Sequence, residues 1–364
     1  MDSNNSQHKA RVLAFYLPQF HPIPENDEWW GKGFTEWTNV GKAKPLFPGH
    51  YQPKVPADLG YYDLRVPETR VAQAELAKEY GIEGFVYWHY WFGNGKRLLE
   101  RPFQEVLESG EPDFPFALAW ANESWKGFYH GVSGRNVLIE QKYGGREDYI
   151  EHFNSILPAF KDKRYIQVDG KPLFMIYHPF EMPDVQYLIS LWRELAERNG
   201  LPGIYFVAIS YDNSQNKKLL KVGFDGINTN HFLDYQKYKR SLVHSIKAKL
   251  LKFLYHCPNF LFYDDVVKYF IAEEEYKENI FPTLLPNWDH SPRTGKTGLI
   301  IWDSSPEKFA ESLCDVKDAI KDKSSDKSLI FIKSWNEWAE GNYLEPDIKY
   351  GRRYLEVIKE KLSI

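Results

Sequence analysis

Two glutamates that stand three positions apart, Glu337 and Glu340, are the residues of this chain best suited to acid/base chemistry. They lie directly after an apolar run typical of a buried strand, in the segment Trp335-Asn336-Glu337-Trp338-Ala339-Glu340-Gly341. Carboxylates are seldom buried without a partner, so this position indicates a site rather than a core. A carboxylate pair can act as acid and base at a glycosidic bond, and aromatic faces stack on sugar rings. The segment therefore predicts chemistry on a carbohydrate.

A structural role for the two glutamates is the alternative. One could begin a helix, and the other could pair with an arginine such as Arg352. The flanking tryptophans favour catalysis, because aromatic walls lower the local polarity and raise the pKa of a nearby carboxyl group. Such a carboxyl group can then donate a proton to a leaving oxygen.

Polar and aromatic residues at other predicted strand ends are further candidates for the same site. Asn122 could hydrogen-bond a sugar hydroxyl, and Glu123 and Asp289 could either contact the sugar or form salt bridges within their loops. Glu36, in the first long loop, is expected to order that loop. The residues predicted to line the sugar site are Trp88, His89, Trp91, Trp120, Asn122, Glu123, Trp288, Asp289, Asn336 and Trp338.

Four histidines at strand ends raise the possibility of a catalytic metal: His21, His89, His178 and His290. Their spacing matches no compact ligand signature, and the segment around His89 is typical of an aromatic wall. We therefore predict no metal and no cofactor. The sequence also contains no phosphate-binding loop, no Asp-x-Asp motif of a nucleotide-sugar site and no Gly-x-Ser-x-Gly motif.

The elements that must position these residues alternate along the chain. Apolar runs that predict strands cover residues 11–16, 84–88, 116–120, 173–177, 204–210, 226–228, 282–285 and 329–333. Helical periodicity follows each of them, at 67–80, 101–109, 146–160, 184–199, 213–221, 264–278, 306–321 and 352–362. Eight strand–helix units without a linker predict a single (β/α)8 barrel domain over residues 1–364.

Three connections are too long to be simple turns: residues 18–65, 122–145 and 230–263. All three follow strands, and the loops after barrel strands carry the active sites of such enzymes. Ten of the 12 tryptophans lie in or beside the loops after the strands, which predicts an aromatic groove at that end of the barrel.

Composition excludes several classes of protein. The net charge of −4 does not favour nucleic acid, and no segment is apolar enough to span a membrane. Two cysteines and a polar N-terminus without a secretory signal predict a cytoplasmic protein. The basic segment 237–254 has apolar residues at helical spacing. It could rest on an anionic membrane or could instead cap the barrel mouth.

The chain resembles the WbsX-like glycosyltransferase family of bacterial O-antigen and capsule gene clusters. The resemblance covers nearly the whole sequence and depends on five motifs: 13–21 (LAFYLPQFH), 29–37 (WWGKGFTEW), 87–91 (YWHYW), 120–123 (WANE) and 335–340 (WNEWAE). That family is in turn similar to the endo-α-mannosidases of glycoside hydrolase family 99, which are (β/α)8 barrels. The resemblance implies a role in surface-polysaccharide biosynthesis, including lipopolysaccharide.

The mannosidases carry a Glu-Trp-His-Glu segment at the end of the last strand. By resemblance, Glu337 would be the base that acts on the sugar 2-hydroxyl, and Glu340 the general acid/base at the glycosidic oxygen. Ala339 stands where the mannosidases have His. The two carboxylates imply retaining chemistry, and the Ala puts specificity for mannose in question.

Several alternatives stay open at this stage. An attack by a second sugar would make the protein a transferase, and an attack by water would make it a glycoside hydrolase. A non-catalytic glycan-binding barrel and a metal-dependent hydrolase are further hypotheses. The expected partner is an oligosaccharide or a lipid-linked glycan, with possible peripheral contact to the inner membrane. The sequence does not predict the oligomeric state.

Overall fold

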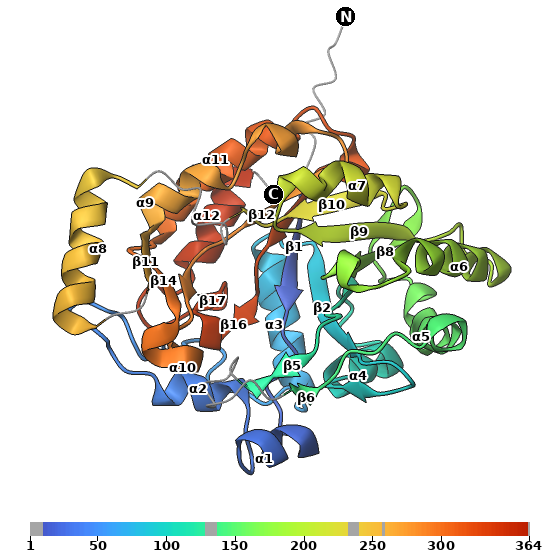
Figure 1. The fold of residues 1–364 in the computed structure, drawn as a ribbon, viewed down its shortest axis with the longest axis horizontal. Coiled ribbons are helices and arrows are strands. Elements are labelled where there is room, and N and C mark those ends of the chain that lie inside the picture. The colour runs from blue at the N-terminus through green and yellow to red at the C-terminus, as the bar shows by residue number, and fades with distance from the viewer. Residues whose placement is uncertain (1–9, 128–136, 232–239, 257–258, 363–364) are drawn as a thin grey trace, which may run out of the picture.

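The computed structural model describes residues 10–127, 137–231, 240–256 and 259–362. Its centre is a closed barrel of eight parallel strands (Figure 1). Strands that are neighbours in the sequence pair in space, and the last pairs with the first in register, with Arg11 beside Leu329. The barrel strands are β1 Arg11–Tyr16, β2 Gly84–Trp91, β4 Phe116–Trp120, β8 Lys171–Ile176, β9 Tyr205–Ser210, β10 Gly226–Thr229, β12 Ile280–Leu284 and β15 Leu329–Ile332. The predicted (β/α)8 barrel is confirmed.

Helices cover the outside of the barrel. They are α3 Pro67–Glu79, α4 Arg101–Ser109, α5 Gly145–Phe160, α6 Val185–Arg198, α7 Asn216–Lys221, α11 Pro306–Ile320 and α12 Arg353–Leu362. In α6 the buried residues recur at helical spacing, at Val185, Leu188, Trp192 and Ala196. One stripe of each such helix can therefore pack on the barrel while the other side meets water.

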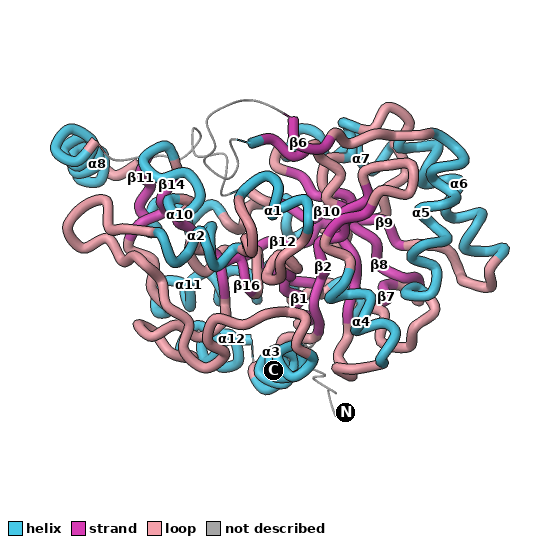
Figure 2. The backbone as a smooth tube through the Cα atoms, turned by 90° about the horizontal axis from the view of Figure 1, so that it is seen from below, coloured by secondary structure: helices cyan, strands magenta, loops and turns pink. Residues whose placement is uncertain are grey.

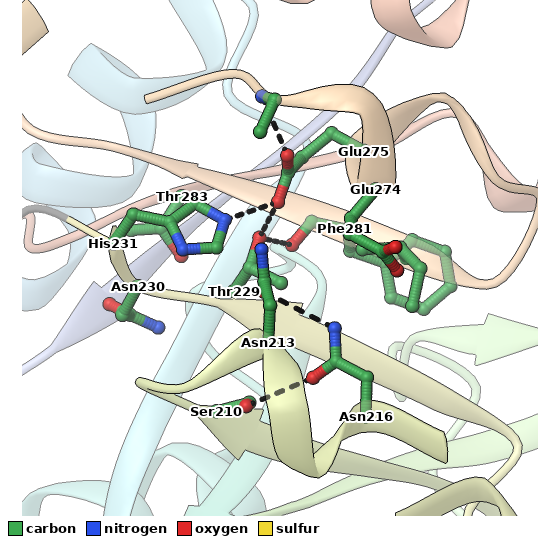
Figure 3. A network of polar contacts seen from close by, with 12 residues as sticks. Ser210, Asn213, Asn216, Thr229, Asn230, His231, Glu274, Glu275, Phe281 and Thr283 are labelled. Atoms are coloured by element: carbon green, nitrogen blue, oxygen red, sulfur yellow. Dashed lines mark hydrogen bonds and ion pairs between the residues drawn. The ribbon is translucent and has the colours of Figure 1, made fainter. Parts of the chain in front are cut away.

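The predicted helix over 264–278 is wrong. This part of the chain forms three short pieces instead: α9 Tyr263–Val266, η6 Val267–Tyr269 and η7 Glu273–Tyr276. Extended backbone at Ala272 interrupts the helix. This break lets Glu275 turn inward, where its buried carboxylate accepts hydrogen bonds from Thr229 Oγ1 (2.6 Å) and the Ala272 backbone (2.8 Å) and pairs with His231 Nε2 (2.6 Å) (Figure 3). The polar network outweighs the local helical preference of the segment.

The three long connections contain elements of their own. The first holds α1 Pro24–Trp30 and α2 Glu36–Lys42, the second β5 Trp125–Lys126 and β6 Val137–Ile139, and the third α8 Leu242–Tyr255 and β11 Asn259–Phe262. In Figure 1, α1, α2, β5 and β6 gather along the lower side of the barrel. The first two of these loops therefore build up one end of the barrel.

A fourth long connection, which the sequence analysis did not predict, follows β12. It contains β13 Trp288–Asp289, α10 Ser291–Thr294, η8 Gly295–Thr297 and β14 Leu299–Trp302. β14 pairs with β11 and β13 in a separate three-stranded sheet. Because β11 and β14 belong to different loops, neither run alone indicates that this sheet exists.

Smaller elements make up the rest of the secondary structure in the described residues. They are β3 Arg97–Leu98, β7 Gln167–Val168, η2 Pro179–Glu181, η3 Asn213–Gln215, η9 Ser325–Lys327, β16 Asn336–Glu337, η10 Trp338–Glu340 and β17 Asn342–Tyr343. None of the helices in the described ranges combines the length and apolar character needed to cross a bilayer.

Replacement of Glu275 tests the network that takes the place of the sixth helix. Glu275→Ala should lower the free energy of unfolding by about 3 kcal/mol, because it leaves buried partners without their acceptor. The exposed neighbour Glu273 supplies the control, and Glu273→Ala should change stability by less than about 0.5 kcal/mol. Equal urea midpoints for the two variants would contradict the assigned role.

The stability difference between the wild type and Glu275→Ala should also depend on pH. Burial opposes the charge on Glu275, but the bonds from His231, Thr229 and the Ala272 backbone lower its pKa below the ordinary value. The stabilisation is therefore fully present above the pKa of an unfolded glutamate and is lost as the pH falls through the folded-state pKa. The difference in urea midpoint between wild type and Glu275→Ala should shrink as the pH falls below about 4.3, the pKa of a free glutamate.

Candidate active site

A cavity of about 630 Å³ opens at the C-terminal ends of the barrel strands. Strand-end residues and the long loops form its wall. The aromatic lining is Trp88, Tyr90, Trp125, Tyr177, Tyr211 and Trp288, and the ionisable lining is Glu123, Lys126, His178, His290, Arg293, Lys333, Glu337 and Glu340. Aromatic faces alternating with carboxylates and cations suit a polar ligand that has apolar faces, as a sugar ring does.

A tight hairpin after β15 presents the two glutamates to this cavity. β16 pairs antiparallel with β17, and η10 forms the turn between them. Gly341 ends η10 with a left-handed backbone (φ 56°), and a Cβ there would lie 2.7 Å from Asp289 Cβ and 2.9 Å from the Asp289 backbone nitrogen. Only glycine fits such a turn, which returns the chain so that Glu337 and Glu340 line the same cavity.

Arg293, which the sequence analysis did not identify, binds three carboxylates. It comes from α10, in the unpredicted loop after β12. Its guanidinium donates to Glu340 and Glu337 (3.3 Å), and also to Glu36 (3.2 Å) from α2. Glu36 is fully buried. This arginine therefore joins three loops at the floor of the cavity, and Glu36 orders the first of them.

The surroundings of the two glutamates move their pKa values apart. Burial, together with repulsion from Glu340, raises the pKa of Glu337 above its ordinary value. Burial also acts on Glu340, but Arg293 and His290 outweigh it and lower the pKa of that carboxyl group. The His290 ring lies 3.4 Å from Glu340 (Nε2 to Oε1). These opposite shifts favour a proton on Glu337 and a charge on Glu340.

Two buried cations balance this group of acids. Burial opposes the charge on Arg293, but Glu36, Glu340 and Glu337 hold its pKa above the ordinary value. Burial likewise acts against Lys333, whose pKa is raised by Tyr211, Glu337 and Glu340. Glu337 and Glu340 thus share two nearby positive charges with Glu36, and the mutual repulsion of the pair adds to the rise in the pKa of Glu337.

Five of the predicted site residues line the cavity: Trp88, Glu123, Trp288, Glu337 and Glu340. Trp88 stacks on Phe15 inside the barrel, with ring centroids 4.8 Å apart. Glu123 lies 3.6 Å from His178 (Oε2 to Nε2). The cavity therefore combines residues from the strand ends of β2, β4, β8, β12 and β15.

Three of the predicted lining residues face the outer helices instead. His89 Nε2 lies 2.8 Å from His152 Nε2 of α5, and Trp91 Nε1 donates to Asp148 of the same helix (3.1 Å). Trp120 Nε1 donates to the Trp91 carbonyl (2.9 Å). Successive side chains of a strand point to opposite faces, so Trp88 and Tyr90 reach the cavity while His89 and Trp91 cannot. Burial lowers the pKa of His89 to about 3, so this ring is neutral.

Four other predicted lining residues support the wall from behind. Asn122 bonds both backbone groups of His178, and Asn336 bonds both backbone groups of Leu17. Each amide side chain thereby fixes the end of a neighbouring strand. All four are buried, and none lines the cavity: Asn122, Asp289, Asn336 and Trp338.

The other two, Asp289 and Trp338, have buried polar partners of their own. Asp289 accepts from Gln52 (2.6 Å) and pairs with His50 (2.7 Å), which anchors the first long loop. Burial acts against its charge, but the hydrogen bond from His50 and the charge of Lys54 lower its pKa to about 2. Trp338 stacks on Tyr343 and donates to the buried Glu345 (2.6 Å).

The sequence analysis missed cavity residues for two reasons. Tyr90, Tyr177 and Lys333 lie at strand ends, and the alternation of each strand could have identified them. The fourth loop, which was not among the three long connections predicted from the sequence, contributes Arg293, Thr294 and Thr297. Among the described residues there is no group of three or more His, Cys, Asp or Glu side chains that could hold a metal.

Comparison with known proteins places this geometry in a family. The family model Glycosyltransferase WbsX matches residues 12–358. The protein WxcX of Xanthomonas campestris pv. campestris is 35% identical over 363 residues, which is 97% of this chain and 50% of the relative. The chain therefore spans about half the length of the curated relatives it matches.

Solved structures share the fold at low sequence identity. The family 99 endo-α-mannosidase of Bacteroides thetaiotaomicron, in complex with Bis-Tris propane, aligns with a TM-score of 0.57, 16% identity and coverage of 97% and 96% of the two chains. A glycoside hydrolase-like protein aligns with a TM-score of 0.62, 13% identity and coverage of 100% and 97%. Family and fold together support a carbohydrate-active enzyme. The chain belongs to the WbsX glycosyltransferase family.

Proposed function

We propose that this protein makes or breaks a glycosidic bond by a two-glutamate retaining mechanism, in bacterial surface-polysaccharide biosynthesis. The observation that supports it most directly is the pair Glu337 and Glu340 in one aromatic cavity, where their surroundings move the two pKa values apart. A retaining mechanism through the sugar's own 2-hydroxyl needs one base and one acid, and the pair supplies both at neutral pH.

The proton balance of the reaction follows from these roles. Glu337 takes the proton of the 2-hydroxyl, whose oxygen attacks the anomeric carbon to form a 1,2-anhydro intermediate. Glu340 gives its proton to the leaving glycosidic oxygen as the bond to the anomeric carbon breaks. In the second half, Glu340 takes a proton from the incoming hydroxyl group, and the 2-hydroxyl regains its own from Glu337. One proton on the pair is enough for every step.

The proposed acid is the glutamate whose pKa is lowered. Arg293 holds Glu340 ionised, whereas the acid role needs Glu340 protonated. We propose that the bound glycan brings its glycosidic oxygen against Glu340 and weakens the bond to Arg293, so that the shared proton moves to Glu340. Arg293 then acts as a positioning residue that sets which glutamate is the acid.

The incoming group decides between transfer and hydrolysis. A second sugar gives a transferase, as the family name states, and water gives a hydrolase like the mannosidases that share the fold. We propose transfer from an oligosaccharide or lipid-linked glycan in the cytoplasm, because the chain has no Asp-x-Asp motif for a nucleotide sugar. Products identified by mass after incubation with host glycans distinguish the two, since only hydrolysis adds one water and creates a new reducing end on the glycosyl fragment.

The acid/base role of Glu340 is tested by the isosteric change Glu340→Gln. Turnover should fall by at least about a thousandfold, because the leaving oxygen loses its proton donor. The exposed Glu28 in the first loop supplies the control, and Glu28→Gln should keep full activity. Activity near that of the wild type, with an unchanged melting temperature, would contradict the assignment.

The role of Arg293 predicts a shift in the pH dependence. Arg293→Gln removes the charge that holds Glu340 ionised, so the lower apparent pKa of the pair rises. Activity needs the pair to have lost one proton, so the acid limb of log kcat/KM against pH should move to higher pH. A fall of about a hundredfold in kcat at the optimum is also expected.

Lys296, in the same loop as Arg293, supplies the matched control. Lys296→Gln removes an exposed positive charge and should leave both the acid limb and kcat unchanged. A purely structural Arg293 would lower the stability of the protein without moving the acid limb, and that outcome would overturn the positioning role.

A further inference from the structure

Helix α8 carries two apolar stripes, of which the described residues cover only one. The helix begins after Ser241, whose hydroxyl accepts from the His244 backbone, and no residue of it is fully buried. Figures 1 and 2 both show α8 at the outer edge of the molecule, beside β11 and β14. A helix of a globular protein ordinarily turns its single apolar stripe toward the core. The second stripe therefore calls for an explanation.

The first stripe attaches α8 to the three-stranded sheet. Ala248, Leu251 and Tyr255 pack on the cluster of Phe47, Phe260 and Ile300. At the edges of this stripe, the His244 ring stacks on Phe262 at 4.1 Å and lies 2.8 Å from Asp265, and Lys247 Nζ lies 4.4 Å from the Trp302 ring centre. These contacts fix which side of the helix faces outward.

The second stripe faces solvent. Its side chains are between 53% and 78% exposed: Leu242, Val243, Ile246, Leu250, Phe253 and Leu254. At 100° per residue they fall within a sector of about 120° on one side of the helix. Six large apolar residues on one exposed stripe form a contiguous patch, and such patches mark an interaction surface.

The charge around this stripe has one sign. Exposed basic residues flank it at Arg240, Lys249 and Lys252, and the sequence from 236 to 263 contains no acidic residue. Lys237 and Lys239 continue the basic run, but they lie outside the described residues. An apolar stripe with basic flanks matches a surface that offers anionic headgroups above acyl chains.

We propose that α8 docks this protein on an anionic lipid bilayer. The helix lies in the plane of the membrane, its second stripe enters the boundary between headgroups and acyl chains, and its basic flanks contact the headgroups. With 14 residues the helix is too short to span the bilayer, so the contact is peripheral.

The docking surface is close in the structure to the candidate active site. β14, on which α8 rests through Ile300 and Trp302, begins at Leu299, and Leu299 lines the cavity together with Thr297 and Gly298. The sheet under α8 therefore reaches one wall of the cavity, and a bilayer on the second stripe lies on the other side of the helix. A lipid-linked glycan is a substrate class that rests on the proposed function, whereas membrane docking itself does not depend on the reaction.

The proposal is tested by co-sedimentation with vesicles of phosphatidylglycerol and phosphatidylethanolamine, and with neutral phosphatidylcholine vesicles. The wild type should bind the anionic vesicles and lose binding as the salt concentration rises. The variant Ile246→Ser/Leu250→Ser/Phe253→Ser should bind at least tenfold more weakly, as should Lys249→Glu/Lys252→Glu. All five side chains are exposed, so the variants should keep the melting temperature of the wild type.

Tyr276 and Ile348 provide the matched control, because they are equally exposed apolar residues elsewhere on the surface, at 55% and 65%. Tyr276→Ser/Ile348→Ser should bind vesicles like the wild type. Absence of wild-type binding, or equal binding by all variants, would overturn the proposal. Self-association that the triple serine variant abolishes, without vesicle binding, would also overturn it and would assign the stripe to a second copy of the chain.

Discussion

The ion pairs of one arginine hold the candidate active site together. Arg293 binds Glu36, Glu337 and Glu340, which come from the first loop and the last strand end, far apart in the sequence. A buried carboxylate without a partner costs several kcal/mol, so the arginine stabilises both segments in their places. The shape of the cavity and the protonation of its acids therefore both depend on a single guanidinium.

The same arrangement explains how two glutamate side chains can differ in pKa. Glu340 lies against Arg293 and His290, whereas Glu337 is buried and feels the charge of Glu340. Lys333 adds a second positive charge beside that of Arg293, so this group contains two cations and three carboxyl groups. The two pKa values therefore move in opposite directions, and the contact between Arg293 and Glu340 contributes to that difference. A site with two such carboxyl groups is suited to acid/base chemistry.

Much of the aromatic character of the chain serves packing rather than binding. Trp91, Trp120, Trp335 and Trp338 are buried almost completely, and several of their indole N–H groups bond internal acceptors. Trp88 and Trp288 remain for the ligand, together with Trp125 from the loop after β4. A strand-end position was therefore a weaker guide to cavity lining than the twofold alternation within the strand.

The sequence alone was sufficient to predict the barrel, most of its strands and helices, and the segment with the two glutamates. Apolar runs and helical periodicity are local properties, so they can be recognised in the sequence without knowledge of the tertiary contacts. Only the tertiary structure decided the rest: the sheet of β11, β13 and β14, the broken helix around Glu275, and the contacts of Arg293. Each of these joins residues from separate segments of the chain, and a pairing between distant residues leaves no pattern in either segment.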